Sequence, residues 1–381
     1  MNQIQKKQIK RLKYFINKSS NLAFLITTTF LLFIIFVITT IFKEDLEFEM
    51  NGYYKFENYA NGMSVYYLDV GQGDCTFIRF DDGKTMLIDS GTRENSTNTI
   101  DFLVNYAFKN KELCIDYVLL THSDLDHSGG LLDIMHIFQV NYVFRPRIYD
   151  NFKNDNTDVD RDEYKKSKFL SIKDEYYHNL IESFYDEPNC EVIFTDLEKC
   201  NQFFENTNYS INFYFPTREF YSSTTNDYSP VFSINYNDTS FLFTGDTNES
   251  IEEEILNRYE LSHVDFLKVA HHGSKTATSN ELLRVIEPKN AIISSGTNSY
   301  GHPTWQVINR LKNYKANILR TDELGYISVN VLEDNISVKN FKIDKVYINI
   351  GYFNIGLLYY FIYVLFTTTK ENFVYNNANK H

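Results

Sequence analysis

Cysteine is scarce in this chain of 381 residues, which contains only Cys75, Cys114, Cys190 and Cys200. No two of them form a C-x-x-C pair, so the sequence argues against a structural zinc site of the knuckle type. We expect four free thiols. The alternative is a bridge between Cys190 and Cys200, which are close in sequence and would pair only in an oxidising compartment.

An excess of positive charge is also absent. The 37 lysines and arginines are outnumbered by 50 aspartates and glutamates, which gives a formal net charge of −13. Such a chain repels nucleic acid at long range unless bound metals or a local basic patch offset the repulsion. Extended binding to duplex DNA is therefore disfavoured, whereas hydrolysis of a phosphodiester held at metal ions is not. Hydrophobic residues make up 43% of the chain, enough for a buried core.

Residues 21–42 are almost wholly apolar, and about this length is needed to cross a bilayer as a helix. A basic tail, residues 1–20, precedes them and acidic residues follow. Positive flanks stay in the cytoplasm, so we expect a transmembrane helix with the rest of the chain outside. No small-x-small cleavage pattern follows, which disfavours the alternative of a cleaved signal peptide. A buried helix is the other alternative.

Residues 346–369 are a weaker candidate for a second crossing. They are rich in Tyr, Phe, Leu and Ile but are diluted by Asn and Gly. The alternatives are an interfacial helix, or a strand and helix that cap the fold. We expect a protein of the cell membrane, single-pass or two-pass, whose main domain is on the extracytoplasmic side.

Residues 62–340 alternate between strand-like and helical patterns. Strands are predicted at 64–70, 75–80, 85–89, 115–121, 140–144, 191–195, 211–215, 231–235, 240–244, 266–270, 291–294, 318–321 and 326–331. Helices are predicted at 97–109, 128–138, 250–259, 280–287 and 304–314. This order indicates an α/β domain of two sheets with helices outside. Residues 147–188 are charged and Gly-poor with helical spacing, and we interpret them as a surface insertion.

Four potential metal ligands fall within six residues, at His122, Asp124, Asp126 and His127. They follow an apolar strand and precede a Gly-Gly helix start. A loop at the carboxyl end of a strand can direct alternating side chains to one point. Imidazole nitrogen and carboxylate oxygen suit Zn²⁺, Mn²⁺ or Fe²⁺. The alternative is a solvated polar loop with chance spacing.

Further motifs follow in order: L-D-V-G-Q-G-D from Leu68, L-I-D-S-G from Leu87, F-T-G-D-T from Phe243, K-V-A-H-H-G-S from Lys268 and Y-G-H-P from Tyr300. Alone, each has an ordinary explanation as a turn, a core histidine or a helix cap. Together with H-x-D-x-D-H they resemble the metallo-β-lactamase fold hydrolases. The form of that run resembles the C-terminal hydrolase domain of ComEC/Rec2-type DNA-uptake proteins. The match covers roughly residues 62 to 335.

The resemblance implies an αββα sandwich that binds two divalent ions, zinc or manganese. It assigns His122 and Asp124 to the first ion, Asp126, His127 and His271 to the second, and Asp246 as the bridging carboxylate. His272 is the less favoured alternative to His271. The resemblance also implies outer residues that orient the ligands, at Asp69, Asp74 and Asp89. For Asp69 and Asp74, a role as simple turn formers is equally open.

The chain departs from the commoner family pattern at the first ion. Asp124 replaces a histidine there, and no clear candidate supplies a third histidine. An oxygen-rich first site is expected to be weaker and to favour Mn²⁺.

The expected chemistry follows from the resemblance. Two bridged ions would lower the pKa of a shared water, and the hydroxide would attack in line. Asp126 or Asp124 would accept a proton. His302 or His272 would contact the phosphate or protonate the leaving group. Ser274 would donate a hydrogen bond to the substrate.

The sequence thus predicts a metal-dependent hydrolase, acting on a phosphodiester of DNA or a nucleotide and attached to the membrane by its N-terminal helix. The DNA-uptake proteins carry many membrane helices, whereas one or two are expected here, so we expect a tethered hydrolase domain. The fold also hosts hydrolases of lactams, thioesters and lactones, and a non-catalytic binding protein is a third alternative. Nothing in the sequence indicates a protein partner.

Overall fold

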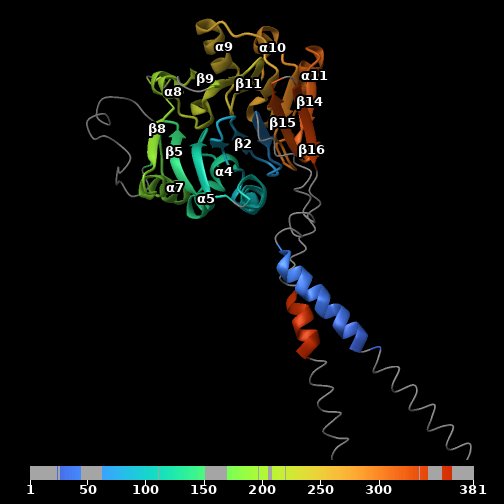
Figure 1. Ribbon diagram of the computed structural model, residues 1–381. Helices are drawn as coiled ribbons and strands as arrows, with labels where there is room; N and C mark the ends of the chain where they lie inside the picture. The colour runs from blue at the N-terminus through green and yellow to red at the C-terminus, as the bar shows by residue number, and fades with distance from the viewer. Residues whose placement is uncertain are drawn as a thin grey trace, which may run out of the picture. The chain divides into compact units, whose positions relative to one another are not determined.

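The structure is a computed structural model. It describes residues 24, 26–43, 62–109, 111–150, 170–195, 197–204, 208–218, 220–333, 335–341 and 354–362. The chain divides into two compact units. One is Lys55–Ile343, and the other combines the terminal segments Met1–Tyr54 and Asp344–His381. Figure 1 shows both units.

The first sheet of the large unit has eight strands in the order β16-β15-β1-β2-β3-β4-β5-β8. Strands β15, β1, β2 and β3 pair antiparallel, and β3, β4, β5 and β8 pair parallel. In that order the strands are Asn335–Phe341, Tyr326–Leu332, Met63–Tyr67, Thr76–Arg79, Thr85–Ile88, Cys114–Leu119, Gln139–Arg145 and Glu191–Phe194.

The second sheet has six strands in the order β14-β13-β12-β11-β10-β9. Strands β9, β10 and β11 are antiparallel, and β11 to β14 are parallel. In that order the strands are Asn317–Arg320, Asn290–Ile293, Phe266–Lys268, Thr239–Phe243, Val231–Tyr236 and Ser210–Phe215. Strands β6 (Ile148–Asp150) and β7 (Leu170–Ile172) form a small separate sheet.

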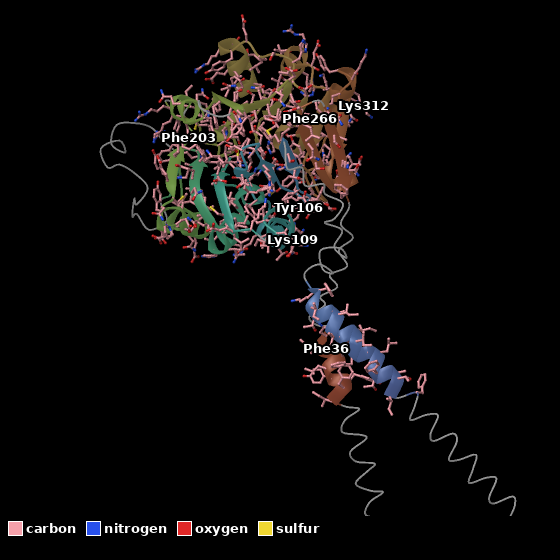
Figure 2. The ribbon with its side chains drawn as sticks, viewed as in Figure 1. Phe36, Tyr106, Lys109, Phe203, Phe266 and Lys312 are labelled. Carbon is pink, nitrogen blue, oxygen red and sulfur yellow. The ribbon has the colours of Figure 1, made fainter. Side chains whose placement is uncertain are left out.

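The two large sheets pack face to face through an aromatic core. The Tyr67 and Phe243 rings, one from each sheet, lie 6.4 Å apart, and Phe80 stacks on Tyr209 at 3.9 Å. Phe266 is also part of this core (Figure 2). Burial of large apolar side chains is the main favourable term in folding, so this interior accounts for the pairing of the sheets.

Helices cover the outer faces of both sheets, with α9, α10 and α11 on one side and α4, α5 and α7 on the opposite side (Figure 1). A second apolar core lies beneath α9–α11 and contains Leu267, Leu283 and Val307. This confirms the predicted α/β class and gives the αββα layering. The helices are α3 (Ser96–Phe102), α4 (Leu125–Ser128), α5 (Leu131–Ile137), α7 (Glu175–Asp186), α8 (Leu197–Phe203), α9 (Glu249–Arg258), α10 (Asn280–Ile286), α11 (Trp305–Asn313) and α12 (Thr321–Leu324).

Helix α7 falls in the range that we interpreted as a surface insertion. One face of it is buried, with Tyr177, Leu180, Ile181 and Phe184 inside. The helix is therefore packed as part of the outer layer. Residues 151–169 of the same range lie outside the described residues.

The terminal unit contains a helix over residues 26–41 and a shorter one over residues 354–362. They contact each other: Thr39 Oγ1 donates to Asn354 Oδ1 at 2.6 Å, and the rings of Phe36 (labelled in Figure 2) and Phe361 lie 6.2 Å apart. Among the helices described, none has the length and apolar character to span a membrane. The predicted tail 1–20 lies outside the described residues, as do parts of both candidate crossings.

Candidate metal centre

Residues predicted to build the metal site follow the carboxyl ends of neighbouring strands. In the first sheet, Asp89 follows β3 and His122 follows β4; in the second, Asp246 follows β11 and His272 follows β12. Because β3 and β4 are parallel, and β11 and β12 are parallel, their carboxyl ends lie at one edge. Contacts between His127 and Asp246 join the two edges, so one site draws on both sheets.

Four side chains form the tighter half of the site. His272 Nε2 lies 3.3 Å from His127 Nε2 and 3.2 Å from Asp126 Oδ2. Asp246 Oδ1 lies 3.3 Å from His127 Nε2, and its Oδ2 lies 3.6 Å from His272 Nε2. Ligands about 2.0–2.2 Å from a tetrahedral ion are separated by about 3.3–3.6 Å. The separations of His272 from His127 and Asp126, and of Asp246 from His127 and His272, therefore match those expected between ligands of one ion.

Outer hydrogen bonds fix the direction of both rings in this half. The buried carboxylate of Asp89 accepts from His127 Nδ1 at 2.8 Å and from the Thr121 backbone at 2.8 Å. The Ser294 carbonyl accepts from His272 Nδ1 at 3.0 Å. With Nδ1 donating, each ring points its Nε2 towards the other candidate ligands, as metal-binding histidines do.

The other half of the site is looser. His122 Nε2 lies 3.8 Å from Asp124 Oδ2 and 4.0 Å from Asp246 Oδ2. His122 Nδ1 contacts the Thr121 hydroxyl at 3.0 Å and the Ser229 hydroxyl at 3.4 Å. The Asp124 side chain is 42% exposed.

Three buried polar atoms in the site have no hydrogen-bond partner: His122 Nε2, Asp246 Oδ1 and Asp74 Oδ1. Buried polar atoms are nearly always paired, so such orphans need an explanation. A divalent cation would satisfy His122 Nε2 and Asp246 Oδ1, and the nitrogen and oxygen donors fit zinc or manganese. In the part of the chain that the structure describes, two groups of buried donors lie close enough together to hold an ion: His122, His127 and Asp246, and Asp74, His127 and His272.

The electrostatics of the cluster also favour a cation. Burial alone would raise the pKa of Asp246, but His127 and His272 hold it well below its usual range. Burial lowers the pKa of His272, yet Asp246, Asp74 and Asp126 raise it to about 10. The carboxylates thus outweigh desolvation and hold positive charge at the centre.

His271, His302 and Ser274 lie around this centre in different ways. His271 is 31% exposed, and its Nε2 lies 3.8 Å from Asp246 Oδ2. The His302 ring lies 5.6 Å from His271, and burial together with His271 lowers the pKa of His302. The Ser274 hydroxyl is bonded to Thr276 at 3.0 Å within its own turn. His302 is therefore a neighbour of His271 at the edge of the cluster. The Ser274 hydroxyl already has a hydrogen-bond partner within its own turn.

The three expected supporting carboxylates are placed differently. Asp89 contacts His127 directly, and Asp74 Oδ1 lies 3.4 Å from His272 Nδ1. Asp69 accepts a hydrogen bond from the Gly71 backbone within its turn. The sequence interpretation missed four supporting residues: Thr121, Ser229, Lys268 and Ser294. Serine, threonine and a strand-end lysine are too common to be singled out by type.

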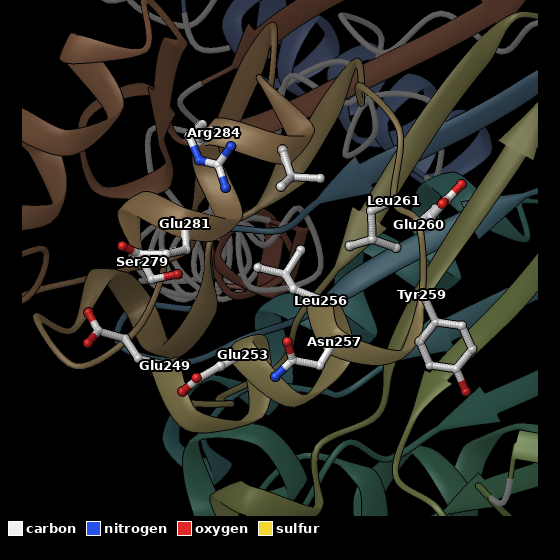
Figure 3. A pocket seen from close by; sticks show the side chains of 11 residues that line it. Glu249, Glu253, Leu256, Asn257, Tyr259, Glu260, Leu261, Ser279, Glu281 and Arg284 are labelled. Carbon is white, nitrogen blue, oxygen red and sulfur yellow. The ribbon is translucent and has the colours of Figure 1, made fainter.

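A pocket of about 610 Å³ opens beside the centre, lined by Asp124, Asp126, Leu125, Thr225 and Tyr300 among others. None of the described residues that line it is a lysine or arginine. A second hollow of about 900 Å³ lies at α9 and α10 (Figure 3). It is lined by several glutamates, among them Glu253 and Glu281, without a histidine. Only the first pocket adjoins the histidine cluster.

The family profile described as the Metallo-beta-lactamase superfamily matches residues 68–189 and 220–297. The chain belongs to this superfamily and is assigned with it to the metal-dependent hydrolases. Among solved structures it is similar to the metallo-beta-lactamase fold protein YhfI from Bacillus subtilis, with 12% identity and a TM-score of 0.42. That match covers 70% of this chain and 100% of YhfI.

Within the superfamily, the chain is similar to proteins of the ComEC/Rec2 type. It is 26% identical to ComE operon protein 3 of Bacillus subtilis over 286 residues, which cover 68% of this chain and 32% of the relative. It is 27% identical to Recombination protein 2 of Haemophilus influenzae over 275 residues, covering 71% of this chain and 29% of the relative. The matched region spans about a third of these relatives.

Proposed function

We propose that the chain hydrolyses a phosphodiester with two divalent ions at this centre. The observation that carries the proposal is the close approach of His272 to His127 and Asp126 and of Asp246 to His127, in a cluster where His122 Nε2 and Asp246 Oδ1 are buried without a hydrogen bond. Bound ions would polarise a phosphoryl oxygen and activate a water for attack.

We assign the ligands by distance and support. Asp126, His127 and His272 hold one ion, His122 and Asp124 hold the other, and Asp246 serves both. We assign His272 in place of His271, which the resemblance favoured, because its Nε2 lies close to Asp126 and its Nδ1 is fixed by Ser294. His271 stays near Asp246 on the more exposed side.

The remaining residues suit work on a bound phosphate. Asp126 has a pKa held below its usual value, since its contact with His272 and the nearby His127 outweigh burial. It is ionised at neutral pH and can accept a hydrogen bond or proton from the attacking water. His302 and His271, on the rim, can donate to a phosphate oxygen or the leaving group.

A second function is favoured by one observation. The described lining of the pocket beside the centre includes Asp124, Asp126 and Asp174, and these carboxylates suit a substrate of low negative charge. Hydrolysis of a lactone, thioester or lactam is therefore the competing proposal.

The test is a substrate panel on the purified full chain. After chelation, Mn²⁺ or Zn²⁺ is returned, and turnover of bis-p-nitrophenyl phosphate, a single-stranded oligonucleotide, a thioester and a lactone is compared. We expect metal-dependent phosphodiester turnover that Asp246→Asn abolishes. The control is Glu253→Gln, which changes an exposed side chain in the hollow at α9 and α10 and should keep full activity. Turnover confined to the thioester or lactone would select the second function.

We also propose that the terminal unit associates with a membrane. Its described helices expose large apolar side chains, including Phe24, Phe30, Ile41 and Tyr359. Exposed apolar surface of this kind marks contact with lipid or protein. The full chain should float with phospholipid vesicles, and changing Phe30 and Ile41 to Asn should weaken flotation. Equal recovery of both in the soluble fraction would reject the proposal.

A further inference from the structure

Lys268 is a buried, positively charged residue beside the proposed metal centre. It is the last residue of β12 and is 3% exposed. Its Nζ donates to Asp74 Oδ2 at 2.6 Å and to the Val269 carbonyl at 3.3 Å. Lysine is almost never buried unless it is paired, so the ion pair with Asp74 accounts for its position.

Asp74 in turn contacts three segments that build the centre. Its backbone N donates to the Asp126 carbonyl at 3.0 Å, and its carbonyl accepts from Gly91 N at 2.8 Å. Its free carboxylate oxygen, Oδ1, lies 3.4 Å from His272 Nδ1. One residue thus connects the loop carrying Asp126 with the loop carrying His272.

The turn that carries Asp74 packs directly against the backbone of Asp126. A Cβ on Gly73 would lie 2.3 Å from the Asp126 carbonyl oxygen, so the two backbones are in direct contact. The same glycine has a φ of 154°, which disfavours any side chain there. A movement of Asp74 would therefore be transmitted to Asp126.

We propose that Lys268 is a positioning residue for the ion held by Asp126, His127 and His272. Its ammonium holds the Asp74 carboxylate in place, and Asp74 keeps the His272 ring and the Asp126 loop at their mutual spacing. This inference rests on the metal assignment of the proposed function.

The physical reason is the balance of charge around Asp74. This buried carboxylate lies between two positive partners, with Oδ2 at 2.6 Å from Lys268 Nζ and Oδ1 at 3.4 Å from His272 Nδ1. Without Lys268, the buried anion keeps His272 as its strongest remaining partner. The ring would then be drawn from the Ser294 carbonyl towards Asp74, and its Nε2 would turn away from the ion.

The test measures metal binding by the full chain, with no dependence on a substrate. Ion affinity is measured by competition with a chromophoric chelator, and ligand geometry by the visible absorption of the Co²⁺ form. Lys268→Met should weaken the tighter ion roughly 10- to 100-fold and change the Co²⁺ spectrum. Lys268→Arg should restore much of the affinity. A double variant, Lys268→Met with Asp74→Asn, should lose less than the sum of the two single losses.

A matched control is the pair of Lys289 and Asp265, which has the same 2.6 Å separation but a 75% exposed lysine. Lys289→Met should leave affinity and spectrum unchanged. Equal affinity and spectrum in wild type and Lys268→Met would overturn the inference. If Lys268→Met fails to fold, as judged by circular dichroism in excess chelator, the near-isosteric Asp74→Asn decides by the same readouts. A wild-type chain that binds no ion would instead defeat the metal assignment itself.

Discussion

The two halves of the histidine–carboxylate cluster differ in how well their donors are supported. His127 and His272 are fully buried, and a carboxylate or a backbone carbonyl fixes each ring. His122 is supported only by hydroxyl groups, and Asp124 is 42% exposed, held by the Thr225 hydroxyl at 2.7 Å. Preorganised ligands lose less freedom on binding, so the two ions should differ in affinity, with the Asp126 side the tighter.

The largest effect is expected at the residue that both halves share. Asp246→Ala removes a donor from both ions and leaves His127 and His122 without their common partner. Ion contributions of several kcal/mol to transition-state stabilisation correspond to a loss of about 10³-fold or more in kcat/KM. Steady-state kinetics with metal analysis would measure it. Retention of two tightly bound ions would show that the two halves do not share this carboxylate.

A substitution in one half of the cluster should weaken the binding of one ion and leave the other ion bound. His272→Ala should release the tighter ion and lower its affinity by about 10³-fold, whereas Asp124→Ala should release only the weaker one. Titration with Mn²⁺ followed by paramagnetic resonance gives the number and affinity of sites in each variant. The reverse result, with Asp124→Ala removing the tighter ion, would contradict the comparison.

The next largest loss of metal affinity is expected at Asp89. Its carboxylate accepts from His127 Nδ1 and from the Thr121 hydroxyl, which in turn contacts His122. Asp89→Ala should weaken metal binding about 10- to 100-fold. Competitive chelation would measure the change. An unaltered affinity would mean that the rings are held by packing alone.

Metal binding should strengthen as pH rises. The pKa of His272 is raised to about 10 and that of His127 lies well above its usual value, because Asp246 lies next to both. At neutral pH both rings are in the doubly protonated form, and an ion must displace one proton from each. Metal affinity should therefore rise by about tenfold or more per pH unit between pH 6 and 8. Calorimetry in buffers of different ionisation enthalpy counts the released protons. Binding without proton release would contradict the assignment of both rings.

The smallest effect is expected at Ser229, whose hydroxyl lies 3.4 Å from His122 Nδ1 and accepts from the Asp246 backbone. Ser229→Ala should weaken only the first ion, by about two- to tenfold, as expected for the loss of a neutral hydrogen bond. The same chelator assay measures this loss of affinity. If Ser229→Ala weakened the tighter ion as much as Asp89→Ala does, the two halves would not differ as proposed.

Much of the fold was predictable because its strands and helices have clear periodicity. The strands that carry Asp89 and Asp246 were placed within two residues of β3 and β11. Strand β16 was missed because it lies at an edge and alternates polar residues with Ile336 and Val338, both of which are exposed. Edge strands show little of the apolar signal on which prediction relies.

The ligand motif was recognisable from spacing, but its geometry was not. His271 and His272 are adjacent, and both have a positive φ, of 50° and 52°. This left-handed turn buries the second ring and leaves the first part exposed, and no periodic pattern anticipates it. Lys268 went unnoticed as a site residue because its partner, Asp74, is 194 positions away in sequence.

The most direct test is a crystal structure of the full chain grown with Mn²⁺, with data collected for anomalous scattering. We expect two peaks about 3.5–4 Å apart, on either side of the Asp246 carboxylate, with the stronger peak between Asp126, His127 and His272. Peaks only at the glutamates of the α9–α10 hollow, or none within reach of Asp246, would contradict a two-ion centre built from both sheets.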